Sequence, residues 1–321
     1  MKHTGFFIFL IAVLLPAMVC RAQFDGQWTH YMMNPGLYNP AAIGLDNDLN
    51  VHIAFREQWT GIHNAPSTMA LHLGYPFRMG KKTDGIGLMM LNESIGLFKT
   101  QIFQGQFSHP FHLAGGQLHL GIQGGILQEN FDSDGIYIPS SDYHNPSDPA
   151  IPDGQLEGMI PDLSAGLWYH HEKWYAGLSG LHLLGGKIKL NEKESTSETD
   201  KTVFPVSRTF YFAGGYNIGL KNPLLSLQPS VLLRSDLVSV QGDLSMLMNY
   251  DKKYWGGLNW RPGDGLGVLI GMSFEMGLSL GYSYDIPLYG PTDGSHEILI
   301  AYRKKIDTSK INRKQKSVRL L

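Results

Sequence analysis

Histidines and acidic residues are the side chains here that could do chemistry, and we find no catalytic set among them. His296 and Glu297 begin like the helix of a zinc protease, but Ile300 occupies the place of the second histidine. The dinucleotide fingerprint and the phosphate loop are both missing. A Ser-His-Asp trio could be assembled by chance from 13 histidines and many serines, so a hydrolase is a weak alternative. We expect no enzyme activity, no catalytic residue and no cofactor.

Acidic residues near position 130 resemble half of a calcium-binding loop. Asp132 and Asp134 precede Gly135, but an EF-hand needs a third oxygen ligand before the glycine and a distal glutamate, and neither is in place. We interpret the region as an acidic surface loop, with adventitious calcium as the alternative; it also contains Asp142, Asp148 and Asp153. Two histidine pairs are interpreted as exposed turns rather than metal ligands: His109 with His112, and His170 with His171. We predict no metal site.

The N-terminus is typical of a secretory leader. Lys2 precedes an apolar stretch over 6–15, and residues 20–22 approximate a small-residue cleavage site, so residues 1–22 are interpreted as a signal peptide. A lipoprotein anchored at Cys20 is the weaker alternative, because the bulky Val19 precedes the cysteine. Since Cys20 is the single cysteine, cleavage after Ala22 leaves no disulfide and no thiol chemistry. An extensive hydrogen-bonded architecture must then hold the exported chain together.

The elements that would position any site are β-strands, because apolar and polar residues alternate along most of the chain. About fourteen strands are expected, and most are longer than the usual five or six residues of a soluble strand. Their lengths suit tilted strands that cross a bilayer. They lie near 51–57, 67–77, 84–92, 98–108, 116–129, 161–170, 174–183, 208–219, 224–234, 238–249, 253–261, 265–275, 277–287 and 295–304.

The connections between these strands favour a membrane barrel over a soluble β-sandwich. The long gaps, 130–160 and 184–207, fall on one side, and the short turns share the other side, as in outer-membrane barrels. Aromatic residues also gather near strand ends, which is typical of interfacial girdles. We therefore predict an all-β transmembrane barrel of about 14 antiparallel strands over residues 51–305, in contact with outer-membrane lipid. Both termini are expected to be periplasmic, and no nucleic-acid partner is expected.

The two flanks of the barrel differ in character. Residues 23–50 contain two Asn-Pro pairs, which make a poor membrane strand and a good rigid double turn. This segment is interpreted as a periplasmic connector or as a folded plug that packs Tyr31, Tyr38 and Trp59 together. Residues 306–321 form a basic tail, which is interpreted as a solvated periplasmic segment, with docking to an anionic partner as the alternative.

Two clusters of residues carry a resemblance to a known family. The first lies in the N-terminal segment, the second lies at and after the first strand, and the last strand, 295–304, also agrees. The signature residues, which are also the candidate partner contacts, are Tyr31, Asn34, Pro35, Asn39, Pro40, Ala41, Arg56, Gln58, Trp59, Gly61 and Pro66. Together these clusters resemble the PorP/SprF family, outer-membrane proteins of the type IX secretion system of Bacteroidota.

The resemblance implies a fold and a role. The fold would be a 14-stranded barrel similar to FadL-like transporters of hydrophobic compounds. The role would be non-enzymatic: assisting the secretion or surface anchoring of cargo proteins and gliding adhesins. Implied partners are cargo with a type B C-terminal domain and periplasmic, peptidoglycan-linked components. The alternative function is an outer-membrane channel or a transporter of hydrophobic compounds.

Overall fold

The computed structural model describes residues 25–46, 48–79, 82–133, 154–192, 202–290 and 292–306. The signal peptide, the tail beyond residue 306 and most of the acidic loop after Asp132 lie outside the described residues. Within them, no helix is long and apolar enough to span a membrane.

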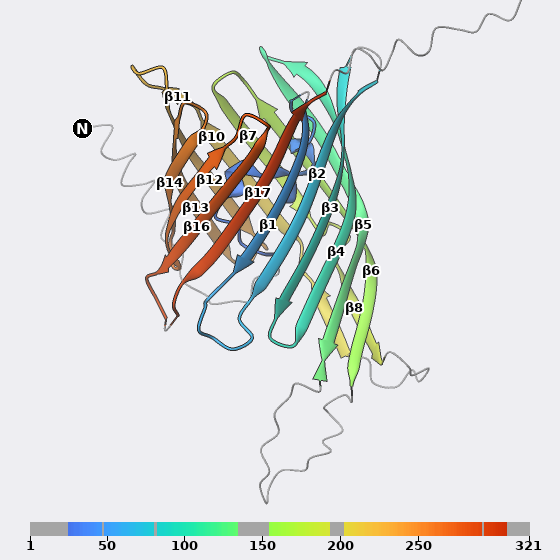
Figure 1. The fold of residues 1–321 in the computed structure, drawn as a ribbon. Coiled ribbons are helices and arrows are strands. Elements are labelled where there is room, and N and C mark those ends of the chain that lie inside the picture. Colours follow the sequence, from blue (N-terminus) through green and yellow to red (C-terminus); the bar gives the residue numbers. More distant parts are fainter. Residues whose placement is uncertain are drawn as a thin grey trace, which may run out of the picture.

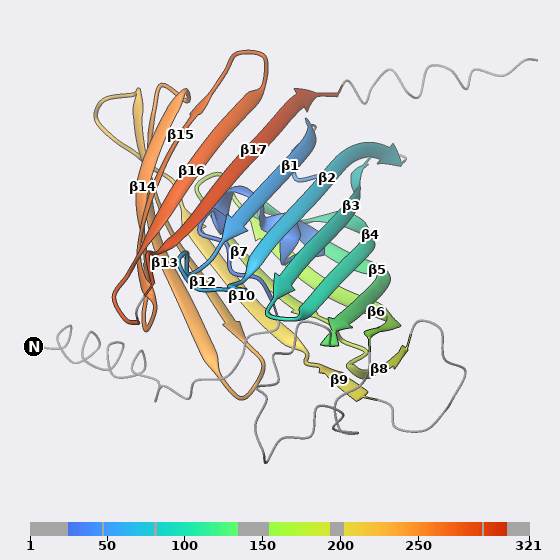
Figure 2. The same cartoon turned by 60° about the horizontal axis from the view of Figure 1, so that its bottom comes forward.

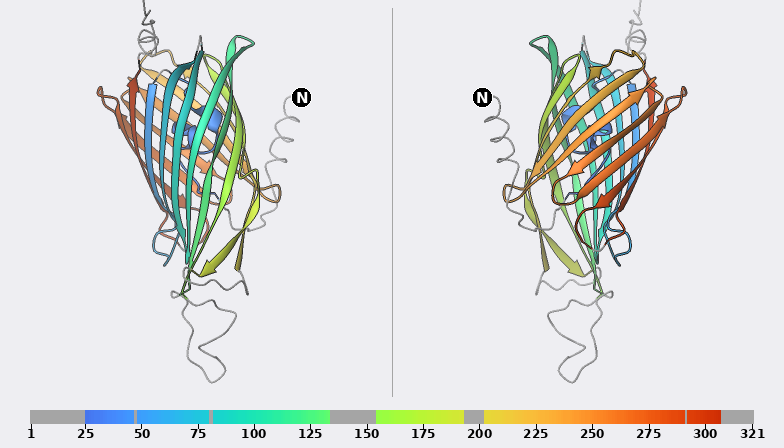
Figure 3. Two further views of the ribbon diagram at one scale, coloured as in Figure 1. Left: turned by 90° about the vertical axis from the view of Figure 1, so that its right-hand side faces the viewer. Right: turned by 90° about the vertical axis from the view of Figure 1, so that its left-hand side faces the viewer.

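A closed barrel of 14 antiparallel strands dominates the structure (Figures 1 and 3). Consecutive strands pair, and β17 returns to pair with β1 over the full length of β1, from Asp48 with Lys305 to Glu57 with His296. The predicted fold is therefore confirmed. The barrel strands are β1 (Asp48–Glu57), β2 (Ser67–Met79), β3 (Lys82–Ile95), β4 (Phe98–Leu113), β5 (Gly116–Asp132), β6 (Gln155–His170), β7 (Trp174–Leu181), β10 (Thr209–Tyr216), β12 (Leu225–Ser235), β13 (Val240–Tyr250), β14 (Tyr254–Arg261), β15 (Gly265–Ser273), β16 (Leu278–Pro287) and β17 (Ser295–Lys305).

The strands form because each has one apolar face and one polar face. In β13, Leu244, Met246 and Met248 point outward and are 38%, 47% and 49% exposed. The intervening Asp243 and Ser245 point into the barrel and are buried. An outward apolar face suits contact with lipid, whereas the polar inward face can hydrogen-bond inside the lumen.

The two ends of the barrel differ. The long-loop end carries the β1–β2 loop (58–66), the β5–β6 connection (133–154) and the β16–β17 loop (288–294). The opposite, short-turn end carries the tight β4–β5, β6–β7 and β13–β14 connections. The last described barrel strand, β17, finishes at the short-turn end, where Lys305 pairs with Asp48.

A short hairpin occupies part of the region predicted as a loop over 184–207. It consists of β8 (Gly186–Glu192) and β9 (Thr202–Val206), and β8 also pairs with the start of β6. Ile188 and Leu190 alternate with two lysines and are buried, so this face packs against the inside of the wall. Phe204 lies 5.6 Å from Phe98 between ring centroids, so the hairpin narrows the long-loop end. A further two-residue strand, β11 (Ile218–Gly219), follows β10.

The N-terminal segment lies inside the barrel (Figure 2). It forms three 3-10 turns: η1 (Tyr31–Met33), η2 (Pro35–Leu37) and η3 (Pro40–Ala42). Tyr31, Ala41 and Ile43 are each at most 1% exposed. The segment is therefore a plug that is packed into the lumen, rather than a connector at the rim.

Candidate functional site

The two Asn-Pro pairs begin turns of the plug, each with proline at the first helical position. Asn39 also joins the plug to the wall. Its side-chain oxygen accepts the Ala41 amide at 2.9 Å, and its nitrogen donates to the carbonyls of Leu167 and Leu178 at 3.0 and 3.2 Å. Asn34 differs, because both polar atoms of its buried amide lack a hydrogen-bond partner within the described residues. The second pair is thus the one that holds the turn against β6 and β7.

Glycines in the wall allow the plug to approach closely. A Cβ atom at Gly121 of β5 would lie 2.2 Å from the Ala41 nitrogen, and one at Gly166 of β6 would lie 2.1 Å from the Asn39 side-chain oxygen. Side chains larger than hydrogen are therefore excluded at both positions unless the plug moves. Gly121 serves close packing, and does not leave open luminal space.

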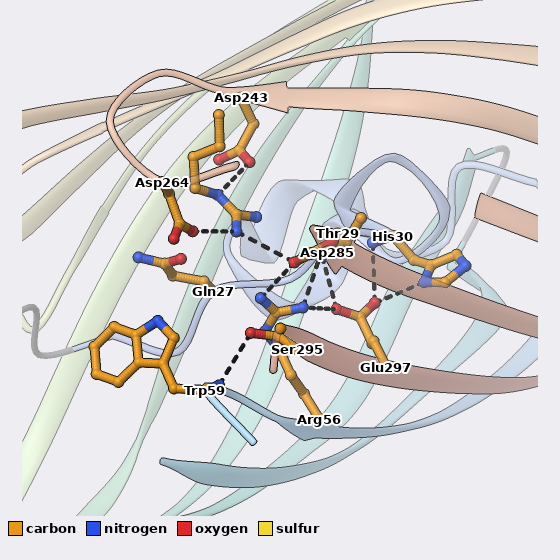
Figure 4. A network of polar contacts seen from close by, with 12 residues as sticks. Gln27, Thr29, His30, Arg56, Trp59, Asp243, Asp264, Asp285, Ser295 and Glu297 are labelled. Atoms are coloured by element: carbon orange, nitrogen blue, oxygen red, sulfur yellow. Dashed lines mark hydrogen bonds and ion pairs between the residues drawn. The ribbon is translucent and has the colours of Figure 1, made fainter. Parts of the chain in front are cut away.

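An arginine of the wall forms the centre of the contact between plug and barrel (Figure 4). Arg56 is fully buried at the end of β1. One guanidinium nitrogen lies 2.6 Å from the Asp285 carboxylate, and the other donates to Glu297 at 3.2 Å and to the Thr29 hydroxyl at 3.1 Å. Since Arg56 and Glu297 are also direct register partners of β1 and β17, the ion pair spans the strand pair that closes the barrel.

Two wall carboxylates hold the first residues of the plug. Glu297 accepts the backbone amides of Thr29 and His30 at 2.7 and 2.9 Å, and the His30 ring at 2.7 Å. Asp285 accepts the Thr29 hydroxyl at 2.8 Å. Charge-assisted hydrogen bonds of this kind are stronger than neutral ones, so this part of the plug is rigidly seated.

A second guanidinium continues the same network. Arg261 is buried and lies 2.7 Å from Asp243, 3.0 Å from Asp264 and 3.4 Å from Asp285. Asp285 therefore lies between two arginines, which compensates its charge inside the barrel. Buried charges are tolerated when they are paired in this way, and removal of one partner is costly.

A third contact holds the start of the described chain. The carboxylate of Asp25 lies 3.1 Å from the His182 ring and accepts the Tyr211 hydroxyl at 2.8 Å. The other ring nitrogen of His182, which follows β7, lies 2.8 Å from Asp162. Burial alone would lower the pKa of His182, but the charge of Asp25 and its hydrogen bonds to Asp162 and Asp25 raise that pKa to about 10. The ring is therefore cationic at neutral pH.

The signature residues from the sequence divide between two places. Tyr31, Asn34, Pro35, Asn39, Pro40 and Ala41 lie in the plug, Arg56 is buried near the end of β1, and Gln58 is buried at the start of the β1–β2 loop. Trp59, Gly61 and Pro66 lie instead in the β1–β2 loop.

The expected packing of Tyr31, Tyr38 and Trp59 is not formed. Tyr38 stacks on Tyr211 at 5.7 Å between ring centroids, whereas the Trp59 side chain is 42% exposed. The reason is the loop backbone: Trp59 has a φ of 52°, and the Thr60 amide donates to the carbonyl of Gly294 at 2.8 Å. The loop is thereby attached to the β16–β17 loop rather than folded over the plug.

The acidic partners of the buried arginines Arg56 and Arg261 are absent from the signature residues. Asp243, Asp285 and Glu297 each occupy an inward position of an alternating strand. The available signal was an ionisable residue at such a position, because a charge facing the lumen must find a partner there.

A hydrolase-like pattern is also present, which the sequence-based search for catalytic motifs overlooks. Gly277-Leu278-Ser279-Leu280-Gly281 spells Gly-x-Ser-x-Gly. The pattern needs a sharp strand-to-helix turn, but here Ser279 lies within β16 and its hydroxyl contacts the Ser273 hydroxyl at 2.7 Å. Its position therefore does not match a nucleophile. In the part of the chain that the structure describes, no three His, Cys, Asp or Glu side chains are grouped to hold a metal.

The space left between plug and wall is small. A cavity of about 40 Å³ is lined by plug residues such as Trp28 and Leu37 and by wall residues such as Met89 and Ile102. At roughly 10–15 Å³ for each water, it has room for about three water molecules. With the plug in place, this part of the lumen has no room for a polypeptide.

Comparisons with known proteins assign the chain to a family. The family model described as type IX secretion system membrane protein PorP/SprF matches residues 20–302. No curated protein sequence matches this chain.

Three solved structures resemble the barrel. The Ralstonia pickettii toluene transporter TbuX has 12% identity and a TM-score of 0.48, and the alignment covers 86% of this chain and 93% of TbuX. The Acinetobacter baumannii outer membrane protein Omp33 has 6% identity and a TM-score of 0.46, and the alignment covers 82% of this chain and 100% of Omp33. The KdgM porin has 6% identity and a TM-score of 0.35, and the alignment covers 79% of this chain and 98% of the porin.

Proposed function

Because this chain belongs to the PorP/SprF family of type IX secretion membrane proteins, we propose that it is a non-enzymatic outer-membrane barrel that assists the secretion or surface anchoring of cargo proteins. The observation that carries the proposal is the plug. It is held by Glu297 and Asp285 and leaves a cavity of about 40 Å³ beside it. An extended strand needs a cross-section of roughly 5 by 10 Å. Cargo is thus handled at the barrel's surface and does not pass through its lumen.

The long-loop end is the proposed place of cargo contact. Its β1–β2 loop presents the exposed Trp59 on a rigid backbone, and the connections between β5 and β6 and between β7 and β10, which were predicted as the long loops, belong to the same end. Exposed aromatic side chains on rigid supports are frequent anchors in protein interfaces. The proposed cargo carries a type B C-terminal domain, and loops or strand edges of this end could capture an extended segment of it by β-addition.

The short-turn end is proposed to face the periplasm. The β17 strand ends there, so the basic tail that follows would be available to peptidoglycan-linked components of the secretion system. The tail over 306–321 contains five basic residues and one acidic residue, which suits an anionic partner.

A channel or a transporter of hydrophobic compounds is the second candidate function. The apolar lining of the cavity beside the plug, which includes Met89, Leu91 and Ile102, favours it. This function requires the plug to leave its position. A large and steady conductance of the purified barrel in planar bilayers would support the second candidate against the first.

Deletion of the gene tests the proposed function. The surface and secreted proteins of the deletion strain are compared with those of the parent and of a strain complemented with the full chain. Loss of one or a few large exported proteins from the surface, restored by complementation, is the expected result. An unchanged set of surface and secreted proteins would contradict the proposal.

A further inference from the structure

We propose that the plug enters the lumen from the long-loop end, so that its N-terminal end at Asp25 opens to the side of the membrane on which the β1–β2 loop lies, opposite the side on which β17 ends at Lys305. This differs from the expectation that both termini are periplasmic. The proposal concerns topology alone and is independent of the cargo role.

The contacts of the first described residues place them in the half of the barrel at the long-loop end. Asp25 meets Tyr211 near the start of β10. A Cβ atom at Gly26 would lie 3.2 Å from the Glu93 carboxylate near the end of β3 and 3.3 Å from Thr68 near the start of β2. Gln27 donates to Gln241 near the start of β13 at 3.0 Å. All of these strand termini border the long-loop end.

The next residues are at the same depth on the other side of the barrel. Thr29 and His30 contact Asp285, near the end of β16, and Glu297, near the start of β17. Contacts on β3, β10, β13, β16 and β17 surround the lumen, so the placement does not depend on one strand. The segment Asp25–His30 therefore lies in the half of the lumen at the long-loop end, and its contacts are distributed around the wall.

The later plug residues have moved to the other half. The Ser108 hydroxyl, in the last third of β4, donates to the carbonyl of Ile43 at 2.6 Å. A Cβ atom at Gly44 would lie 2.5 Å from Gly85, near the start of β3, and β1 then begins at the short-turn end. The chain thus runs along the lumen in one direction, from the long-loop end at Asp25 to the short-turn end at Asp48.

The polarity is fixed by charged contacts that a reversed plug would lose. Asp25 is matched to the cationic His182, and the amides of Thr29 and His30 are matched to Glu297. Reversal would separate Asp25 from His182 and would remove the amide donors of Glu297 and the Thr29 hydroxyl that contacts Asp285 and Arg56, and breaking buried charged contacts is strongly unfavourable. The Asp25 end of the plug is therefore held at the long-loop end of the barrel.

Cysteine labelling tests this topology, because the described chain contains no cysteine of its own. A short Gly-Ser linker with one cysteine is inserted between Phe24 and Asp25 in the full chain, in two lengths. His63→Cys in the β1–β2 loop reports the long-loop end, and Glu172→Cys in the β6–β7 turn reports the short-turn end; both side chains are exposed. A membrane-impermeant maleimide is applied to intact cells, to permeabilised cells and to denatured protein.

We expect the inserted cysteine to be labelled together with His63→Cys, and Glu172→Cys to behave in the opposite way. Because the comparison is relative, it holds whichever end of the barrel faces outward. An inserted cysteine that follows Glu172→Cys, or that reacts only in denatured protein, would overturn the proposal. Heat-modifiable migration on gels confirms that each variant is a folded barrel. The outcome leaves the cargo hypothesis untouched, since that is tested by the deletion strain.

Discussion

Glu297 on the last strand and His30 in the plug are joined twice, because the same carboxylate oxygen accepts the backbone amide of His30 at 2.9 Å and its ring nitrogen at 2.7 Å. Glu297 also pairs with Arg56 on the first strand. One carboxylate therefore connects the plug, the first strand and the last strand. This arrangement makes the stability of the barrel dependent on the seating of the plug.

The Glu297→Gln variant should be less stable than the parent by about 2–4 kcal/mol, because it leaves Arg56 with Asp285 alone, which Arg56 shares with Arg261, and replaces a carboxylate by a neutral amide at the donors of Thr29 and His30. The measurement is the urea midpoint of unfolding in detergent or lipid. Glu275→Gln is the matched control, since the Glu275 side chain is 89% exposed in the β15–β16 turn. Equal midpoints for the two variants would contradict the role assigned to Glu297.

The Gly121→Val variant should displace the plug or prevent folding, because its side chain would occupy the place of the Ala41 backbone, 2.2 Å from the nitrogen. Overpacking of this kind costs about 1–3 kcal/mol or more. Gly124→Val is the matched control in the same strand, because its nearest neighbours lie 3.8 Å from the added Cβ. Thermal unfolding and single-channel conductance are measured. If the Gly121→Val barrel has the same unfolding temperature and the same low conductance as the control, the plug does not fit the wall this closely.

Replacement of Trp59 by alanine should leave the barrel folded and should reduce cargo retention at the surface, because the indole is exposed while the loop is held by backbone hydrogen bonds. Leu237→Ala is the control. Leu237 is also at the long-loop end, is 77% exposed and has a φ of 68°, so both substitutions remove an exposed apolar group from a left-handed position. Surface cargo is quantified on intact cells. If the two variants retain cargo equally, Trp59 is not the contact.

The stability of the barrel should fall as the pH rises from about 6.5 toward about 10. Burial alone would lower the pKa of His182, but Asp25 and Asp162 outweigh this effect and raise the pKa in the folded state from 6.5 to about 10. Between these values the folded ring keeps a proton that the unfolded chain loses, so its contribution is complete below pH 6.5 and disappears as the pH passes 10. Unfolding midpoints at pH 6.5, 8 and 9.5 are compared with those of His182→Gln. Parallel slopes for the two proteins would refute this assignment.

Much of the barrel could be predicted from the sequence, because an alternating strand identifies itself locally. Leu244 and Met246 alternate with the polar residues Asp243 and Ser245, and this pattern indicates both the strand and its outward face. The β8–β9 hairpin was missed although Ile188 and Leu190 alternate with lysines in the same way. The run is only seven residues long and lies in a long polar gap, where local alternation is weak evidence.

The site itself depended on contacts that the sequence does not encode locally. The two Asn-Pro pairs indicate turns, but their position inside the lumen follows from wall glycines such as Gly121. Arg56 is a signature residue, yet its partners Asp285 and Glu297 are 229 and 241 positions away. The registers of β17 against β1 and of β16 against β17 bring them together, and periodicity does not determine register.

The direct pairing of Arg56 with Glu297 across the closing strands has a consequence for biogenesis. The plug is synthesised before the wall, and the last strand supplies the carboxylate that receives it. A barrel that closed without the plug would leave Glu297 without its three hydrogen bonds to Thr29 and His30, and Asp285 without the Thr29 hydroxyl. Closure of the barrel and binding of the plug therefore stabilise one another, so we expect the pairing of the first and last strands to be most stable around a lumen that already holds the plug.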